Sequence, residues 1–251
     1  MHNTNHSVIS LSGSTLKMIA IITMLIDHIG ASVVGPVRQQ LPVGNHIGDF
    51  CRLIYPHMRN IGRLAFPIFC FLLVEGFLHT RNVKKYALRM FLFSLISELP
   101  FDYAFSNHLI YNLHQNVYFT LWIGLLVMMG MSYFEFRFTT SRTGKYINLI
   151  MQVLIAGCGL WLARFLHTDY SYKGVFLIIV LYSLRLDRKL QAIFGAITIS
   201  WEAFAPLAFI PVWFYNGQRG QQMKYFFYWF YPVHLFILGF LRHIVIPYCL
   251  S

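Results

Sequence analysis

Apolar runs of about the length of a bilayer alternate with short polar stretches along almost the whole chain. The first run, residues 16–34, contains about 19 residues, which rise roughly 30 Å as a helix and match the hydrocarbon core of a bilayer. We expect an all-α fold, a polytopic membrane helical bundle of about eight transmembrane helices, within a range of seven to nine. The predicted spans are residues 16–34, 61–79, 86–103, 116–133, 147–166, 175–184, 192–213 and 225–246.

Glycine and proline predict where these spans end or break. Residues 36–58 contain several of both and are expected to form a long connection. Pro67 predicts a kink in the second span, and Pro206 with Pro211 can divide the seventh span into two pieces. The polar residues 1–14 form an N-terminal tail in which Ser12 begins a capping sequence for the first helix. The rest of the chain is predicted to be a single integral membrane domain.

Composition agrees with a membrane protein. The chain is 57% hydrophobic and 12% charged, whereas a soluble domain has about 25% charged residues. The net charge of +11 does not indicate nucleic-acid binding, because Lys and Arg occur in short clusters between apolar runs and form no continuous basic face. With eight complete spans, more of these cations fall on the side that holds both termini, so the positive-inside rule predicts cytoplasmic termini.

Other common sequence classes have little support. The first span carries polar residues and lacks a small-residue cleavage site, so it is predicted to be a permanent helix and not a signal peptide. The cysteines are widely spaced, and no HxxxH pair accompanies them, so we predict no metal site and no disulfide framework. They are Cys51, Cys70, Cys158 and Cys249. Glycine motifs of soluble hydrolases and nucleotide-binding proteins are not found in the sequence.

Two polar residues, Asp27 and His28, interrupt the first apolar run. A charged group at membrane depth costs about 2.5 to 3.5 kcal/mol on insertion scales, and such groups usually face a protein interior or a watery cavity. Adjacent residues lie about 100° apart around a helix, so each of the two needs a partner from another helix. His28 suits a general base near neutral pH, and Asp27 suits a charge-balancing group. The alternative is a buried polar pair that holds helices together.

The second span carries Arg63 and Glu75, and Arg59 lies one turn before Arg63. Arg63 suits either phosphate or carboxylate binding through its planar fork or an interfacial position, and Arg59 is interpreted as interfacial. Glu75 lies deep in the span, where it is expected to pair with an arginine or to form hydrogen bonds when protonated.

Further polar residues lie near predicted helix ends. Glu98 and Asp102 are one turn apart, and His114 and Asn116 belong to a polar cluster that opens the fourth span. These groups suit substrate binding or simple solvation. His234, in the last span, has the same two interpretations as His28, and the structural one is favoured.

Five segments together resemble the TraX family of bacterial membrane proteins. They occur in order over nearly the whole chain and comprise residues 16–30, 61–102, 114–121, 168–174 and 224–235. The family is named for a conjugative-plasmid protein that N-acetylates the amino terminus of pilin, and it resembles the type 3 membrane acyltransferases. The resemblance implies an acetyl-CoA-dependent O- or N-acetyltransferase of the bacterial inner membrane.

The resemblance also implies roles for particular residues. By position it covers Asp27, His28, Arg63, Tyr231 and His234. For the implied reaction we expect the catalytic residues to be His28, Asp27, Arg63 and Glu75. The substrate-binding residues are expected to be Glu98, Asp102, His114, Asn116, Asp169, Tyr231 and His234. The implied partners are the lipid bilayer, acyl-CoA and a peptide, protein or small-molecule acceptor, with an N-terminal amine of a pilin-like protein among the candidates. The alternatives are a small transporter or channel and a non-catalytic assembly factor.

Overall fold

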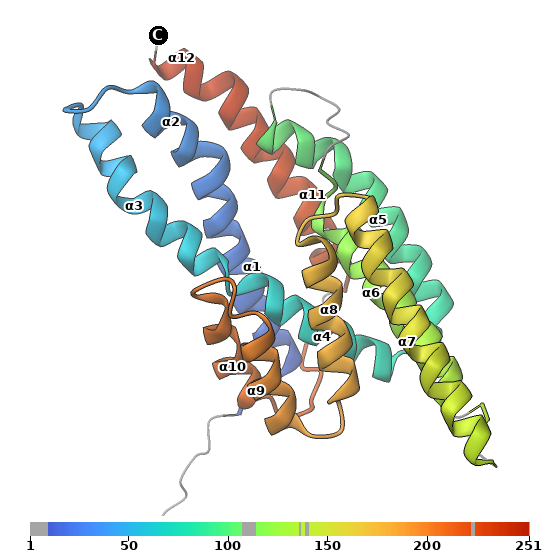
Figure 1. Ribbon diagram of the computed structural model, residues 1–251. Coiled ribbons are helices and arrows are strands. Elements are labelled where there is room, and N and C mark those ends of the chain that lie inside the picture. The colour runs from blue at the N-terminus through green and yellow to red at the C-terminus, as the bar shows by residue number, and fades with distance from the viewer. Residues whose placement is uncertain (1–9, 107–113, 136, 139–140, 222–223, 251) are drawn as a thin grey trace, which may run out of the picture.

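The computed structural model describes residues 10–106, 114–135, 137–138, 141–221 and 224–250, and these residues form a bundle of helices (Figure 1). Between them the described residues contain two isolated β-bridges and no longer strand. The long helices are α1 (Gly13–Ile29), α3 (His46–Gly62), α4 (Ala65–His79), α5 (Val83–Phe105), α6 (Val117–Glu135), α7 (Arg142–Phe165), α8 (Ser171–Ser183), α9 (Arg188–Thr198) and α11 (Lys224–Phe240). The shorter ones are η1 (Gly30–Val34), α2 (Gly35–Gln40), η2 (Ala205–Ala208), α10 (Phe209–Trp213), η3 (Leu241–Val245) and α12 (Ile246–Leu250).

The all-α, polytopic prediction is confirmed. Within the described part of the chain, five helical stretches are long and apolar enough to cross a membrane, namely Gly13–Gln40, His46–His79, Val117–Glu135, Arg142–Phe165 and Tyr225–Tyr248. Helix α8 is a shorter apolar helix, and α5 coincides with the predicted third span. The predicted N-cap is also present, because the Ser12 hydroxyl accepts a hydrogen bond from the Thr15 backbone N–H at 3.3 Å.

The predicted connection over residues 36–58 is wrong. Most of this segment is helical in α2 and α3, separated by a turn in which Gly44 has φ +93°. The Asn45 side chain accepts hydrogen bonds from the N–H groups of Ile47 and Gly48 and so starts α3. Pro36 lies in the first turn of α2, where a helix needs no proline N–H, and Pro56 is accommodated inside α3.

The second predicted span corresponds to α4, which is the second part of a longer helical stretch that α3 begins. Helices α3 and α4 follow one another with a break at Arg63 and Leu64, and this break is where the chain departs from regular helix. Pro67 falls in the first turn of α4, so the predicted kink lies a few residues earlier than the proline itself. As a result the Arg63 side chain stands at a break in the backbone, where partners from other elements can reach it.

The seventh predicted span is divided, as its prolines allow. Helix α9 runs into turns over residues 199–204, and the chain returns through η2 and α10 beside α9. The segment after α10 then pairs with the start of α1, because the Leu11 N–H donates to the Phe214 carbonyl at 2.9 Å and Gly13 N–H donates to Gln218 O at 2.8 Å. The hairpin of α9 and α10 therefore begins and ends at one end of the bundle (Figure 1).

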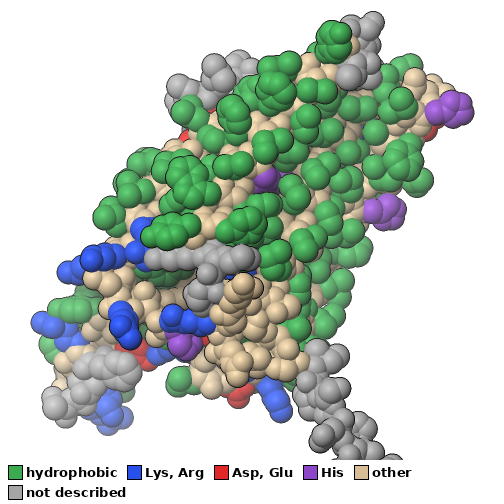
Figure 2. Space-filling view, turned by 180° about the vertical axis from the view of Figure 1, so that it is seen from behind, with side chains coloured by type: hydrophobic (Ala, Val, Ile, Leu, Met, Phe, Trp, Pro, Cys, Tyr) green, Lys and Arg blue, Asp and Glu red, His purple; other side chains and the backbone are tan. Residues whose placement is uncertain are grey.

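This hairpin changes the expected placement of the termini. Helix α11 begins next to the start of α1, and the two run in the same direction, so α12 ends near α2 at the opposite end of the bundle (Figure 1). The prediction that both termini share one side assumed eight complete spans and does not match this path. It also moves Arg219 and Lys224 to the end that holds the α4–α5 turn. Figure 2 shows Lys and Arg gathered towards this end and a broad hydrophobic surface over the rest of the visible face.

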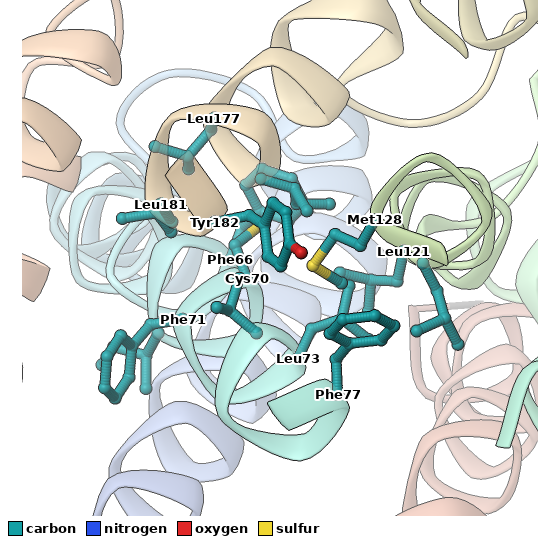
Figure 3. Close-up of a cluster of buried hydrophobic side chains, with 14 of the residues drawn as sticks. Phe66, Cys70, Phe71, Leu73, Phe77, Leu121, Met128, Leu177, Leu181 and Tyr182 are labelled. Carbon is teal, nitrogen blue, oxygen red and sulfur yellow. The ribbon is translucent and has the colours of Figure 1, made fainter. Parts of the chain in front are cut away.

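The core lies around α4. Its side chains Phe66, Cys70, Phe71, Leu73 and Phe77 are buried in a cluster that also includes residues of α6 and α8 (Figure 3), and Phe71 lies against Tyr215 on another side of α4. Helix α4 is apolar on all sides, which is the pattern expected of a helix surrounded by other helices. A second, smaller buried cluster joins α1 to α5 and α11 through residues that include Met24, Ala104 and Leu235. The functional residues predicted in the first span lie beside this smaller cluster.

Candidate functional site

A cavity of about 190 Å³ lies beside Asp27 and His28 at the C-terminal end of α1. Its wall also includes Arg59, Arg63 and Asp169, and aromatic rings of α4 and α5 close the rest. The volume is enough for several waters, each of which occupies about 30 Å³ in the liquid, or for a small acyl group. We refer to this space as the histidine cavity.

His28 is held by a second histidine from α11. The His28 Nδ1 and the His234 Nε2 are 2.7 Å apart, and the His234 Nδ1 is 2.7 Å from the carbonyl oxygen of Phe230. A carbonyl oxygen can only accept, so in neutral rings His234 carries its proton on Nδ1 and its Nε2 accepts from His28 Nδ1–H. His28 is then left with an unprotonated Nε2. This is the nitrogen that can take a proton from another molecule.

Asp27 is paired with Arg59, which the sequence analysis had placed at the interface. The Arg59 guanidinium and the Asp27 carboxylate are 2.8 Å apart, and their side chains are 25% and 15% exposed. The second carboxylate oxygen, Oδ1, is buried and has no hydrogen-bond partner among the described residues. The close approach of α3 to α1 depends on Gly62, because a Cβ there would lie 2.1 Å from the Cβ of Asp27.

Arg63 forms a second charged pair in the same wall. Its Nε lies 3.1 Å from the Glu202 carboxylate, which the turn between α9 and η2 brings to the break between α3 and α4. Arg63 also forms a side-chain hydrogen bond with Tyr170. Two arginines one helical turn apart, Arg59 and Arg63, thus line the histidine cavity with different carboxylate partners.

The segment between α7 and α8 is fixed in a strained conformation. His167, Tyr170 and Ser171 have positive φ angles of 51°, 61° and 48°, which non-glycine residues rarely adopt. The segment is held by Gln115, whose carbonyl accepts from the Asp169 N–H at 2.9 Å. Tyr170 stacks on Phe66 with ring centroids 3.7 Å apart. Strain of this kind is maintained only where the surroundings enforce it, and here it aims two side chains at the cavity.

Asp169 is the acidic member of that segment. Its side chain is buried, which raises the pKa of the Asp169 carboxyl, while nearby His114 and the Tyr170 N–H oppose the rise. The protonated form is therefore more accessible than in an exposed aspartate. A carboxyl of this kind can hold or release a proton close to the two arginines.

Two further structural features lie next to His28. The helix continues after Ile29 as the π-helix η1, a geometry that is rare and frequent at functional sites. Within it, the Ser32 hydroxyl donates to the Ala104 carbonyl at 2.8 Å and so ties the end of α1 to α5. Tyr231 lies edge-on to His28, with ring centroids 6.0 Å apart.

The structure brings together part of the predicted set. His28, Asp27, Arg63 and Asp169 line the histidine cavity, and His234 and Tyr231 lie beside it. Arg59 was interpreted as interfacial from the sequence, and Tyr170 and Glu202 were not among the predicted site residues. The spacing of Arg59 and Arg63 by one helical turn was a usable signal, whereas the pairing of Glu202 depends on a turn between helices and leaves no local pattern.

Besides Tyr231 and His234, five predicted residues do not line the histidine cavity. Glu75 pairs with an arginine, as expected, but this arginine is Arg188, 3.1 Å away at the other end of α4, so Glu75 lies away from His28. The Asn116 side chain is buried and donates to the Ser94 carbonyl and to Glu98, which connects the start of α6 to α5. Asp102 is buried in α5, and His114 is exposed. The structural interpretation fits Asn116 and Glu98 better than substrate binding.

Comparison with known proteins identifies the family of this chain. The model of the TraX protein family matches residues 12–242. The chain belongs to the TraX family. Its matched region includes the complete wall of the histidine cavity. The chain is also similar to the "Probable fimbrial assembly protein FimC, serogroup H1" of Dichelobacter nodosus, with 29% identity over 92% of this chain and 95% of that protein. No solved structure gives a significant match.

Proposed function

We propose that this TraX-family protein is a membrane-embedded acyltransferase that moves an acetyl group from acetyl-CoA to an amine or hydroxyl acceptor. The observation that supports it most is the hydrogen-bonded pair of histidines, which leaves the His28 Nε2 unprotonated in a cavity whose wall includes two arginines. A base with a free lone pair next to fixed cations is the combination that acyl transfer requires.

In the proposed reaction the acceptor N–H or O–H faces the His28 Nε2. His28 takes the proton while the acceptor nitrogen or oxygen attacks the thioester carbonyl carbon, so a new bond to carbon forms and the carbonyl oxygen becomes negative. Arg63, oriented by Glu202 and Tyr170, and Arg59, oriented by Asp27, are the cations near that oxygen. The carbon–sulfur bond then breaks, and the CoA thiolate leaves with the proton that His28 carries.

The acceptor is proposed from the relative's name and from the carboxylates of the site. The similar protein is described as a fimbrial assembly protein, which supports an acceptor of the pilin class with a free N-terminal amine. Asp27 Oδ1 and the Asp169 carboxyl are the acidic groups available to orient an ammonium before it loses its proton. The location consistent with this reaction is the bacterial cytoplasmic membrane.

The test is acetyl transfer by protein purified in detergent, with labelled acetyl-CoA and a synthetic peptide that has a free N-terminus. His28→Ala should lower the transfer rate by about 10² to 10⁴-fold, the usual contribution of a general base. His46→Ala is the matched control, because His46 is exposed on α3 at the other end of the bundle. Full transfer by folded His28→Ala, or solute flux across proteoliposomes without any transfer by the unchanged protein, would contradict the proposal.

A further inference from the structure

A second and larger cavity, of about 710 Å³, opens at the end of the bundle where α1 begins. It lies between α1, α4, α5, α6 and α11 and reaches the segment after α10 through Tyr215 and Arg219. We refer to it as the basic-mouthed cavity. Its size is appropriate for a ligand much larger than anything that the histidine cavity could hold.

The mouth of this cavity is positively charged. Lys17, Arg81, Arg89 and Arg219 line it, and none of them belongs to an ion pair within the described part of the chain. The acidic residue in the lining, Glu75, is paired with Arg188 and therefore does not neutralise the mouth. The four cations form an attractive site for an anion with several charges, because none of them has to give up an ion pair before it binds a phosphate oxygen.

Contacts with other segments hold two of these cations, Arg219 and Lys17, in place. The Ser14 N–H donates to the Arg219 carbonyl at 3.0 Å, and the Arg219 guanidinium donates to the carbonyl of His79. The Lys17 ammonium lies over the ring of Phe227, 5.2 Å from its centroid. Residues from the start of α1, the end of α4 and the segment before α11 thus meet at one mouth, although they are far apart in the sequence.

The interior of the cavity is mostly apolar and adjoins the histidine cavity. Met24, Phe69 and Val117 line both spaces, so the two cavities share a wall. Met24 is four residues before His28 on α1, so this wall lies one helical turn from the proposed base. We refer to the apolar interior between the mouth and this wall as the apolar passage. A single elongated ligand can occupy the mouth with one end and bring the other end to the wall beside His28.

The distance from the mouth to His28 indicates how long the ligand should be. Lys17 and His28 are eleven residues apart on α1, which corresponds to about 16 Å along the helix axis. The pantetheine arm between the phosphates and the sulfur of a CoA thioester has about twelve bonds of peptide-like geometry and spans about 14 Å when extended. With its phosphates at the mouth, the thioester of such a molecule reaches the His28 end of the passage.

We propose that the basic-mouthed cavity is the binding site of the acyl donor, with the phosphates of CoA at Lys17, Arg81 and Arg219 and the pantetheine arm in the apolar passage. This inference rests on the proposed function, since it places the donor of that reaction. The chemistry shared with an alternative ligand is a phosphate joined to an apolar chain, and an anionic phospholipid has it too. The path to the histidine cavity favours the thioester.

A direct binding assay tests the role of the cations at the mouth without requiring catalysis. Lys17→Gln and Arg219→Gln should each weaken CoA binding about tenfold, the loss of one charge-assisted contact, and leave the weaker binding of pantetheine, which lacks the phosphates, unchanged. Lys145→Gln is the matched control, because Lys145 is exposed at the start of α7, outside both cavities. Unchanged CoA binding in both mouth variants, or an equal loss of pantetheine binding, would overturn the proposal.

Cysteine protection gives a second measurement that does not depend on mutating the cations. Thr80→Cys lines the mouth and Val43→Cys lies at the opposite end; each is made in a chain with the native cysteines replaced. CoA should slow labelling of Cys at position 80 by a polar thiol reagent at least fivefold and not at position 43. Protection by phosphatidylglycerol vesicles but not by CoA would identify a lipid site and overturn the proposal. Transfer by the unchanged protein together with absent protection would reject this site and leave the proposed reaction standing, whereas protection without transfer would reject the reaction.

Discussion

Asp27 and Glu75 are both carboxylates in apolar helices, and both pair with one arginine. The Asp27–Arg59 distance is 2.8 Å and the Glu75–Arg188 distance is 3.1 Å, and the two carboxylate side chains are 15% and 9% exposed. By the cost of placing a charge at membrane depth they are equally good candidates for function. The two carboxylates differ in the contacts that surround each ion pair.

In the Glu75–Arg188 pair, the arginine has further partners within the protein. Arg188 lies over the rings of Phe71 and Tyr215, 4.6 and 4.8 Å from the centroids, and donates to the Gln191 side chain at 2.9 Å. This arrangement joins α4 to α9. We call such an ion pair between helices, with further partners from the protein, a lock.

Both carboxylates line cavities, Asp27 the histidine cavity and Glu75 the basic-mouthed cavity, but the Asp27 pair is less complete. Asp27 Oδ1 has no hydrogen-bond partner among the described residues, and its neighbours in the wall are His28, Arg63 and Asp169. The comparison shows that a buried charge indicates function when its partners leave part of its bonding capacity directed at open space. The insertion cost alone does not distinguish a lock from a site.

The largest expected effect that tests this comparison is on the rate of acetyl transfer. We expect Asp27→Asn to lower the acetyl-transfer rate per folded molecule about 100-fold, since it removes a charge that orients Arg59 beside the reacting group. Glu75→Gln should lower the same rate by no more than about tenfold, measured at saturating acetyl-CoA. Single-turnover assays with equal amounts of folded protein measure both rates. A larger loss in Glu75→Gln than in Asp27→Asn would reverse the assignment of lock and site.

Glycines next to the two carboxylates give a second, smaller effect. Gly62→Ala places a Cβ 2.1 Å from the Asp27 Cβ, so α3 must move away from α1, and we expect it to destabilise the fold by about 1 to 3 kcal/mol. Gly76→Ala beside Glu75 meets the Tyr86 hydroxyl at 3.1 Å, a milder contact, and should cost less.

Thermal unfolding in detergent measures both changes. Gly157→Ala is the control, because nothing lies within 4 Å of its added Cβ, and alanine should stabilise α7 slightly through its helix propensity. If Gly62→Ala and Gly157→Ala unfold at the same temperature, the close contact between α1 and α3 at Asp27 does not exist in solution.

The sequence predicted most of the fold because apolar length is a strong signal. The helices α1, α5, α6, α7 and α11 coincide with predicted spans to within a few residues. Helix α3 was missed because its prolines and glycines were interpreted as loop signals, whereas Pro56 is tolerated inside the helix. The direction of the C-terminal helix was missed because it depends on whether the chain crosses or returns at residues 199–204, which local composition does not determine.

The site was predictable only in part, for a related physical reason. Asp27 and His28 stood out because polar residues are rare in a span. Their partners Arg59 and His234 come from other helices, and which charges meet is set by packing that a single sequence does not reveal. The same signal that identified Asp27 also selected Glu75, whose partner lies on α9. Tyr170 gave no signal, since its position depends on a strained turn.

The smallest effect concerns the two arginines. Arg188→Lys loses the stacking on two aromatic rings and the bond to Gln191, so we expect a loss of about 1 kcal/mol, or a Tm lower by about 2 to 4 °C for a chain of this size. Arg59→Lys should cost less, because no aromatic contact of Arg59 occurs among the described residues and an ammonium can still pair with Asp27.

Differential scanning fluorimetry of the two lysine variants in the same detergent measures this difference, with Arg142→Lys on the exposed start of α7 as the control. The Tm of Arg142→Lys should not change. If Arg59→Lys lowers the Tm as much as Arg188→Lys does, then the Asp27 pair is as strongly integrated into the protein as the Glu75 pair. In that case the unfilled bonding capacity of Asp27 cannot be what distinguishes a site from a lock, and the argument for the histidine cavity would rest on His28 alone.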